Sequence, residues 1–252
     1  MCGRFVSASP PEEIAEYFGA VAVGDPLESR YNVAPTLDVY VVYEQPGAEP
    51  SAARRLDQFY WGLVPGFAKD MKIGARMINA RSETAATNNS FRGSLARRRC
   101  IVPADGFYEW QKFEGSKAKQ PFYIHRADGH QLAMAGLWAE WRGVVAGEAV
   151  AVRSTTILTT AANDTVRPLH DRMPVILPRR AWDEWLDPAN QRIERVQDLL
   201  VPAPASLLVM HPVAAEVGNA RNEGSHLIDE LDPTQVIGAS ASDASEQLGF
   251  WP

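Results

Sequence analysis

The sequence predicts an α+β fold, in which a mostly antiparallel β-sheet curls into a barrel-like core and short helices flank it. Segments with the composition of strands predominate in the middle of the chain, and helical segments are interspersed without a regular βαβ alternation. The 252 residues are 46% hydrophobic and 22% charged, which is typical of a globular protein and not of a disordered one. This length is compatible with one domain whose core needs no disulfide bonds.

The individual elements follow from local patterns. A helix over 13–18 is expected because Ser9-Pro10-Pro11-Glu12 has the form of a capping box, with proline at the first helical position. Strands are expected over 39–43, 58–63, 122–125, 132–141, 149–159 and 175–177. Turns are expected at Asp128-Gly129 and Arg142-Gly143, and further helices over 90–98, 179–186 and 193–199. We expect one domain over 1–231 and a loose tail over 232–252, which begins beyond the last of these elements.

Charge is distributed unevenly along the chain, although the net charge of −6 argues against a uniformly basic protein. Between Arg54 and Cys100 there are ten Lys or Arg and three Asp or Glu, a net +7. From Asp183 to Pro252 there are twelve Asp or Glu and three Arg, a net −9. A basic middle is compatible with an anion-binding face, including one for a phosphate backbone. A mixed solvated surface would give the same counts, so charge alone leaves both interpretations open.

Several classes of protein are disfavoured by what the sequence lacks. Two cysteines, Cys2 and Cys100, rule out a disulfide-rich scaffold, and we expect Cys100 to be buried and structural. No apolar run approaches the roughly 20 residues that span a bilayer, and the N-terminus lacks the pattern of a signal peptide. There is no GxxxxGK[ST], GxGxxG, CxxC or HExxH motif. We therefore expect a cytoplasmic monomer without metal or organic cofactor.

Cys2 is the residue with the most distinctive chemistry. Initiator methionine is removed when the second residue is small, so we expect the mature chain to begin with Cys2. Its α-amine, with a reference pKa of about 7.7–8.0, and its thiol, at about 8.5, would both supply nucleophile near neutral pH. Such a 1,2-aminothiol condenses with an aldehyde to an imine, and the thiol can then close a thiazolidine ring. Taken alone, the Met-Cys start favours an inert cysteine.

Motifs elsewhere in the chain change this balance. They are RYNVAP at 30–35, WGLVPGF at 61–67, INARSET at 78–84, PADGFYEW at 103–110, TTAAN at 159–163, HDRMP at 170–174, HPV at 211–213 and VGN at 217–219. Together with Cys2, and in this order, they closely resemble the SRAP family of abasic-site processing proteins. The resemblance extends from Cys2 to about Leu231 and implies a single SRAP-like domain.

The resemblance implies an enzyme that forms a thiazolidine crosslink between Cys2 and an abasic site in single-stranded DNA. Self-catalysed removal of Met1, strand cleavage as a side activity and a role in the SOS response to DNA damage are implied as well. Matched by position, Asn79 holds the terminal cysteine and the sugar, Glu109 shuttles protons beside the α-amine, and His170 assists opening of the sugar ring. Thr160 lines the same site.

The DNA contacts are carried over in the same way. Arg4, Arg81 and Arg172 lie in motifs whose arginines contact backbone phosphates in the family. Phe67 stands where the family often has tryptophan, and its smaller aromatic face would pack on a base beside the lesion. The segment 68–77 is longer than in some members of the family, so strand placement there can differ.

Two alternatives remain open at this point. An N-terminal-nucleophile hydrolase or autoprotease would use Cys2 to attack an amide, with its own amine as base. A noncatalytic module for binding single-stranded DNA would not need Cys2 at all. The basic middle of the chain is compatible with the crosslinking enzyme and with the binding module, but it gives a peptidase no support.

Overall fold

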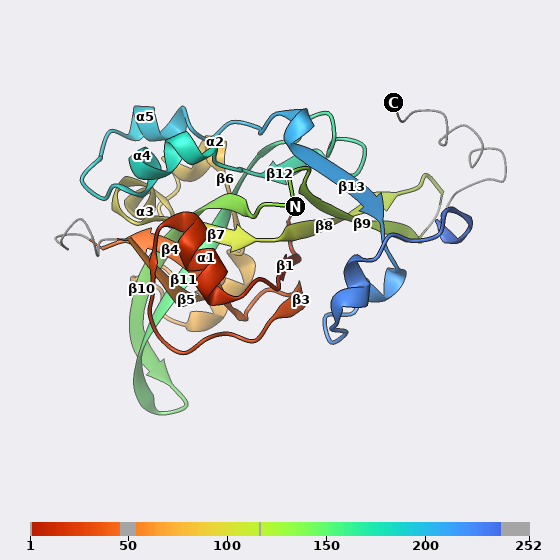
Figure 1. Cartoon of the computed structure of the whole chain (residues 1–252). Helices are drawn as coiled ribbons and strands as arrows, with labels where there is room; N and C mark the ends of the chain where they lie inside the picture. The colour runs from red at the N-terminus through yellow and green to blue at the C-terminus, as the bar shows by residue number, and fades with distance from the viewer. Residues whose placement is uncertain (1, 46–53, 116, 238–252) are drawn as a thin grey trace.

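Five strands close into a barrel in the computed structural model, which describes residues 2–45, 54–115 and 117–237 (Figure 1). Around the ring they are β11 (Glu148–Ala161), β10 (Leu132–Val145), β7 (Arg99–Ala104), β4 (Asp38–Glu44) and β5 (Arg54–Trp61). Neighbouring strands run antiparallel until the barrel closes, where β5 and β11 pair in parallel through Ser154 and Thr155. The α+β, barrel-like fold class predicted from the sequence is therefore confirmed.

Three short strands extend this sheet: β2 (Val21–Ala22), β6 (Asn79–Arg81) and β12 (Arg172–Pro174). Both β6 and β12 pair with β11, which runs parallel to β6 and antiparallel to β12. The central strand β11 therefore brings together residues that lie about ninety positions apart in the sequence.

A second, five-stranded antiparallel sheet holds the N-terminus. Its strands, in spatial order, are β13 (Leu208–Pro212), β9 (Lys119–Arg126), β8 (Gly106–Lys112), β1 (Phe5–Ser7) and β3 (Arg30–Val33). Because β1 lies between β8 and β3, the start of the chain lies in the middle of the molecule beside β8 (Figure 1).

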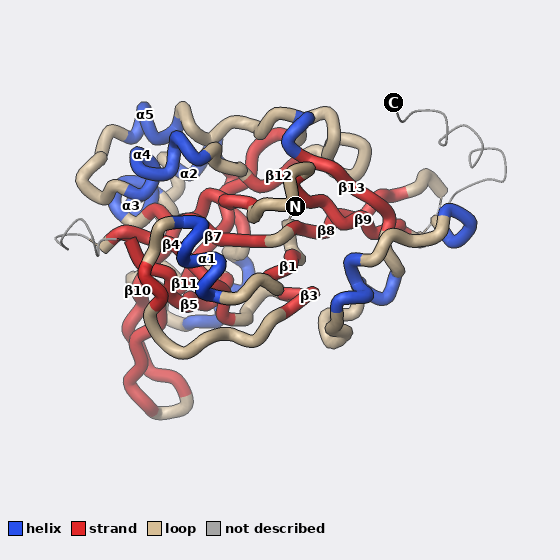
Figure 2. Tube along the Cα trace, in the orientation of Figure 1, coloured by secondary structure: helices blue, strands red, loops and turns tan. Residues whose placement is uncertain are grey.

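The helices are short and mostly gather on one side of the barrel, as the blue segments of Figure 2 show. They are α1 (Pro11–Phe18), α2 (Ser82–Ala85), α3 (Arg92–Arg97), α4 (Trp182–Leu186) and α5 (Ile193–Gln197). Short 3-10 helices occupy Met71–Arg76, Arg179–Ala181, Ala205–Leu207, Ala215–Gly218, Ser225–Ile228 and Pro233–Gln235. None of the helices in the described part of the chain is long and apolar enough to cross a membrane.

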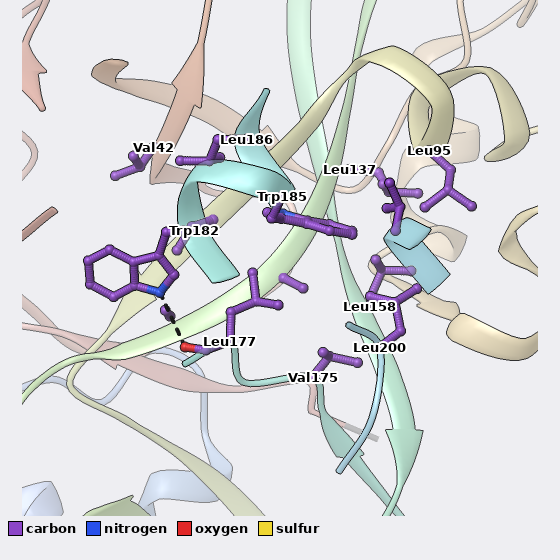
Figure 3. Packing of buried hydrophobic residues seen from close by; sticks show 14 of the residues in the cluster. Val42, Leu95, Leu137, Leu158, Val175, Leu177, Trp182, Trp185, Leu186 and Leu200 are labelled. Atoms are coloured by element: carbon purple, nitrogen blue, oxygen red, sulfur yellow. Dashed lines mark hydrogen bonds between the residues drawn. The ribbon is translucent and has the colours of Figure 1, made fainter. Parts of the chain in front are cut away.

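Successive residues of β4 contribute to two of the three hydrophobic clusters formed by the described residues. On β4, Tyr40 and Val42 join a cluster with Trp182 and Trp185 of α4, which packs the helices onto the sheet (Figure 3). The indole N–H of Trp182 donates to the carbonyl of Leu177 at 3.2 Å. A second cluster, which links both sheets and contains Cys2, includes Val39, Val41 and Tyr43 of the same strand. The catalytic candidate is therefore embedded in the junction between the sheets.

Most expected elements are present with shifted ends, but the start of α1 differs from the prediction. The helix begins at Pro11, and its cap residue Pro10 supplies no side-chain hydrogen bond. Ser9 bonds the carboxylate of Asp105 instead, so the predicted capping box is wrong. The tertiary partner Asp105 also accepts the backbone N–H of Ala8 and Ser9, and this outcompetes local capping.

Three further expectations about strands and turns differ from the structure in position or in kind. The hairpin between β10 and β11 turns at Ala146-Gly147, where φ is 51° and 90°, and not at Arg142-Gly143. Gly143 serves packing, because a Cβ there would lie 2.1 Å from the ring of Trp141. The strand expected over 58–63 is β5 and ends at Trp61, since Gly62 has a φ of 141°.

The third concerns 175–177, which forms no strand. The N–H of Val175 donates to Leu158 of β11, whereas that of Leu177 donates to Ala133 of β10. The segment therefore passes from β11 to β10, where it forms only an isolated antiparallel bridge between Ile176 and Met134. Of the expected tail, 232–237 is described, with the N–H of Ile237 donating to Gln120, and 238–252 lies outside the described residues.

Candidate active site

Cys2 is completely buried at the junction of the sheets, packed in the cluster that also contains Phe5, Phe107 and Met173. Burial raises the pKa of its thiol well above the usual range, and the negative charge of Glu109 raises it further. A hydrogen bond with the backbone of Arg4 acts in the opposite direction. The thiol is therefore held in its neutral form until a neighbouring group accepts its proton.

Asn79 is brought to Cys2 by the pairing of β6 with β11, where it lies opposite Ile157. Its side-chain amide donates to the carbonyl oxygen of Cys2 at 2.7 Å. Its Oδ1 is buried and accepts no hydrogen bond from any described residue. The amide nitrogen of Asn79 thus fixes the position of Cys2. The amide oxygen can accept a hydrogen bond from a group outside the described residues.

Glu109 lies on β8, which is paired on one side with β1 and on the other with β9. Its side chain is only 4% exposed, and its charge acts on the Cys2 thiol. A carboxylate in this position can take a proton from a nearby donor and return it to another atom. The expected grouping of Cys2, Asn79 and Glu109 is present in the structure.

His170 lies on the turn that leads into β12, and its backbone N–H donates to Val166. Its Nδ1 accepts the N–H of Arg172 at 2.9 Å and lies 2.7 Å from a carboxylate oxygen of Asp171. The backbone amide is a donor and suits an unprotonated Nδ1, whereas the carboxylate is an acceptor and suits a protonated one, so Nδ1 can serve either as donor or as acceptor in this turn. The flanking Leu169 and Met173 pack in the same cluster as Cys2, so the His170 turn borders the same buried region.

Thr160 is 5% exposed on β11, opposite Met173 of β12. It therefore lies on the strand between Asn79 of β6 and the residues that follow His170. Its neighbour Thr159 lies opposite Arg81.

The three arginines expected to contact DNA lie in different surroundings. Arg81 is exposed on β6. Arg4 is half-buried, and its Nη1 donates to Asn32 at 2.7 Å and to the carbonyl of Val217 at 2.9 Å. Arg172 forms a two-pronged ion pair with Glu83, with N–O distances of 2.6 and 2.9 Å. In this structure two of the three guanidinium groups are therefore bonded to protein.

Phe67 is 68% exposed, in the turn closed by the hydrogen bond from Ala68 N–H to the carbonyl of Pro65. It borders a small hollow that is also lined by Ser90 before α3, Gly93 within α3 and Arg98 directly after it. The indole N–H of Trp141 donates to the carbonyl of Ala68 at 2.8 Å and holds this turn against β10. An aromatic face is thus presented to solvent at a hollow that Arg98 also lines.

Three residues inside the recognised motifs acquire contacts that sequence reasoning did not assign. Asn32 is fully buried and donates through Nδ2 to the carbonyls of residues 217, 219 and 222, so it joins β3 to the segment after β13. Asp171 lies beside His170, and Glu83 lies beside Arg172. The motifs that contain them were the only signal, because the sequence does not show which side chains meet.

Cys100 is fully buried, as expected, and burial raises the pKa of its thiol to about 12. No group of three or more His, Cys, Asp or Glu in the described ranges is arranged to hold a metal ion.

Comparison with known proteins gives a consistent result. The abasic site processing protein YoaM of Bacillus subtilis (strain 168) is 36% identical over 232 residues, 91% of this chain and 98% of the relative. YedK of Escherichia coli (strain K12), also called an abasic site processing protein, is 36% identical over 242 residues, 92% of this chain and 100% of the relative. HMCES of Gallus gallus, of the same description, is 32% identical over 220 residues, 77% and 64% of the two chains.

Solved structures share the fold. A Bacteroides thetaiotaomicron protein superimposes with a TM-score of 0.80 at 21% identity, covering 92% of this chain and all of the other. A Bordetella bronchiseptica protein gives 0.69 at 30% identity, covering 84% and 100%. The model of the SRAP family, described as SOS response associated peptidase, matches residues 1–220. Because this family model covers most of the chain and both YoaM and YedK are 36% identical over nearly their whole length, the chain belongs to the SRAP family.

Proposed function

We propose that this protein captures abasic sites in single-stranded DNA by forming a thiazolidine crosslink through Cys2, once Met1 has been removed. The proposal places it on DNA in the cytoplasm, as a monomer that shields the lesion and needs no cofactor. The observation that carries it is the hydrogen bond between Asn79 and the Cys2 carbonyl, formed next to the buried charge of Glu109.

The chemistry requires only groups of the chain and the DNA. The α-amine of Cys2 attacks the aldehyde carbon of the ring-opened sugar, and loss of water leaves an imine. The sulfur then bonds to the imine carbon, while the thiol proton moves to the nitrogen. Because burial keeps the Cys2 thiol protonated, this last step needs a proton relay, and the Glu109 carboxylate is suited to it. His170 is suited to assisting the opening of the sugar, because an imidazole can both donate and accept a proton near neutral pH.

The surface around the site supports a single-stranded substrate. Arg81 and Arg172 belong to β6 and β12, which flank β11. Phe67 offers an exposed aromatic face, on which an unpaired base can stack. A paired duplex would first have to be unstacked, at a cost of a few kcal/mol.

The test is incubation of the Met1-free protein with an abasic single strand, with the same strand lacking the lesion, and with an abasic duplex, followed by a denaturing gel. We expect a heat-stable covalent species that is strongest with the abasic single strand. Cys2→Ala keeps the amine, which can form a reversible imine, but it has no sulfur to close the ring. It should give no stable species without a reductant, whereas the thiol control Cys100→Ala should react normally. A stable adduct from Cys2→Ala would refute the proposal.

A peptidase activity is the second candidate, favoured by the description of the family model as a peptidase. In this case Cys2 would take part in hydrolysis of the bond to Met1. Purified protein that retains Met1 should then lose one methionine on incubation, as seen by intact mass. Failure to lose it in the absence of an aminopeptidase would assign the removal to another enzyme.

A further inference from the structure

The ion pair between Glu83 and Arg172 lies at the edge of the proposed DNA site. Glu83 is in the first turn of α2, directly after β6, and Arg172 begins β12. Two guanidinium nitrogens meet two carboxylate oxygens, Nη1 to Oε1 at 2.6 Å and Nη2 to Oε2 at 2.9 Å. This is the paired geometry with which arginine also binds a phosphate.

The remaining donors of Arg172 are poorly placed to take a phosphate instead. Nη2 also donates to the carbonyl of Thr159 at 2.5 Å, and Nε is buried without a hydrogen-bond partner among the described residues. The side chain as a whole is only 15% exposed, whereas that of Glu83 is 52% exposed. The outward-facing pair of donors is therefore the pair that Glu83 occupies.

The charges around Glu83 reinforce this arrangement. The hydrogen bonds from Arg172 hold the pKa of Glu83 below its usual range, and the charges of Arg172 and Arg81 add to the effect. The carboxylate is therefore ionised at neutral pH and offsets positive charge at two of the three arginines expected to contact DNA.

We propose that Glu83 is an internal substitute for phosphate, which occupies Arg172 in the free protein and is displaced by the DNA backbone. The inference rests on the proposed function, because it assigns the occupant of the same site. The consequence is selectivity. Lesion-free DNA must compete with Glu83 for Arg172 and binds weakly, whereas an abasic strand is retained by the covalent bond to Cys2.

The test measures noncovalent binding of a lesion-free single-stranded oligonucleotide over a range of salt concentrations. Glu83→Gln should tighten binding about three- to tenfold at low salt, since it frees one cation for a phosphate. It should also steepen the dependence of log K on log salt by about 0.7, the value for one further phosphate contact on a single strand. Glu13→Gln, on the exposed face of α1, changes net charge equally and should do neither.

A double-mutant cycle identifies the partner. In the Arg172→Gln background, Glu83→Gln should have no effect beyond that of Glu13→Gln. Unchanged or weaker binding of the Glu83→Gln protein, or tightening that persists without Arg172, would overturn the inference. Thermal unfolding shows whether the variants are folded. The second variant is Glu83→Asp, whose side chain is too short for the paired contact. It should tighten binding partially. Crosslinking of the parent to an abasic strand is scored separately, so its failure would refute the proposed function and not the role of Glu83.

Discussion

The carbonyl oxygen of Cys2 accepts a hydrogen bond of 2.7 Å from the side-chain amide of Asn79, although 77 positions separate them. The two residues come from different sheets, since Cys2 precedes β1 and Asn79 begins β6. The contact therefore fixes the N-terminal residue against the barrel strand β11. It holds the first residues of the chain, which would otherwise be free to fray.

Asn79→Ala should slow crosslinking about tenfold, because loss of one positioning hydrogen bond is worth about 1 kcal/mol and the freed terminus samples unproductive positions. Asn79→Asp should be slower still, since a carboxylate cannot donate to the Cys2 carbonyl and adds negative charge beside the thiol. Single-turnover rates at saturating DNA isolate this effect from binding. Rates equal to the parent for both variants would contradict a positioning role for Asn79.

Alkaline stability should report the buried thiols. In the folded protein the pKa of Cys100 is raised to about 12, whereas an unfolded cysteine titrates near 8.5. A raised pKa stabilises the fold below the unfolded value, and this contribution is lost as pH rises toward the folded value. Between about pH 9 and 11 the free energy of unfolding should therefore fall by about 1.4 kcal/mol per pH unit from this group.

Cys100→Ala removes that slope while leaving the Cys2 thiol in place. Denaturant unfolding of both proteins at several pH values measures the difference. Parallel pH profiles for the parent and the variant would mean that the thiol is not protected from ionisation in the folded state.

The secondary structure could be predicted largely from the sequence, because the runs of β-branched and aromatic residues on β4 and β9 and the apolar pattern of α4 are local signals. The closure of the barrel could not be predicted in this way. It depends on parallel pairing between β5 and β11, and no local pattern around Tyr60 or Ser154 indicates that these two residues pair. Ser9 shows the same limit. The local sequence predicts that it caps the first helix, but in the fold its hydroxyl bonds the carboxylate of Asp105.

The candidate site divides in the same way. The resemblance implied that Asn79 and Glu109 lie beside Cys2; in the structure Asn79 bonds its carbonyl and the charge of Glu109 acts on its thiol. Arginine in a motif indicates an anion contact, but the sequence does not show that Glu83 already supplies that anion to Arg172. Nor does it show that Arg4 bonds Asn32 and Val217, which ties the N-terminal strand to the segment after β13.

Phe67 should contribute to binding and not to bond formation. Phe67→Ala removes an exposed stacking face and should weaken noncovalent binding of single-stranded DNA by about 1–3 kcal/mol, or roughly five- to 150-fold. Phe67→Trp offers a larger face and should bind more tightly than the parent. Fluorescence anisotropy with a labelled oligonucleotide measures both, with Val201→Ala as the control for loss of another exposed apolar side chain. Equal affinities across the Phe67 series would remove the stacking contact from the proposal.

Glu109 and His170 should act on rates and not on the identity of the product, because neither becomes bonded to DNA. Glu109→Gln keeps the shape and removes the acid–base function, which typically supplies 10²–10⁴-fold in rate. His170→Ala should slow opening of the sugar more than closure of the thiazolidine ring. Both variants should still approach the parent's yield of crosslink over long incubation.

The reverse reaction makes this prediction decisive. By microscopic reversibility, groups that assist proton transfer in one direction assist it in the other, so adducts formed by either variant should also release slowly. Time courses of formation, and of release after transfer to competitor DNA, give both rates. Asp171→Asn, which leaves the imidazole in place but removes the carboxylate 2.7 Å from Nδ1, is the matched control and should retain most of the maximal rate. Forward and reverse rates within about twofold of the parent for both Glu109→Gln and His170→Ala would show that neither residue transfers the protons, whatever Cys2 does.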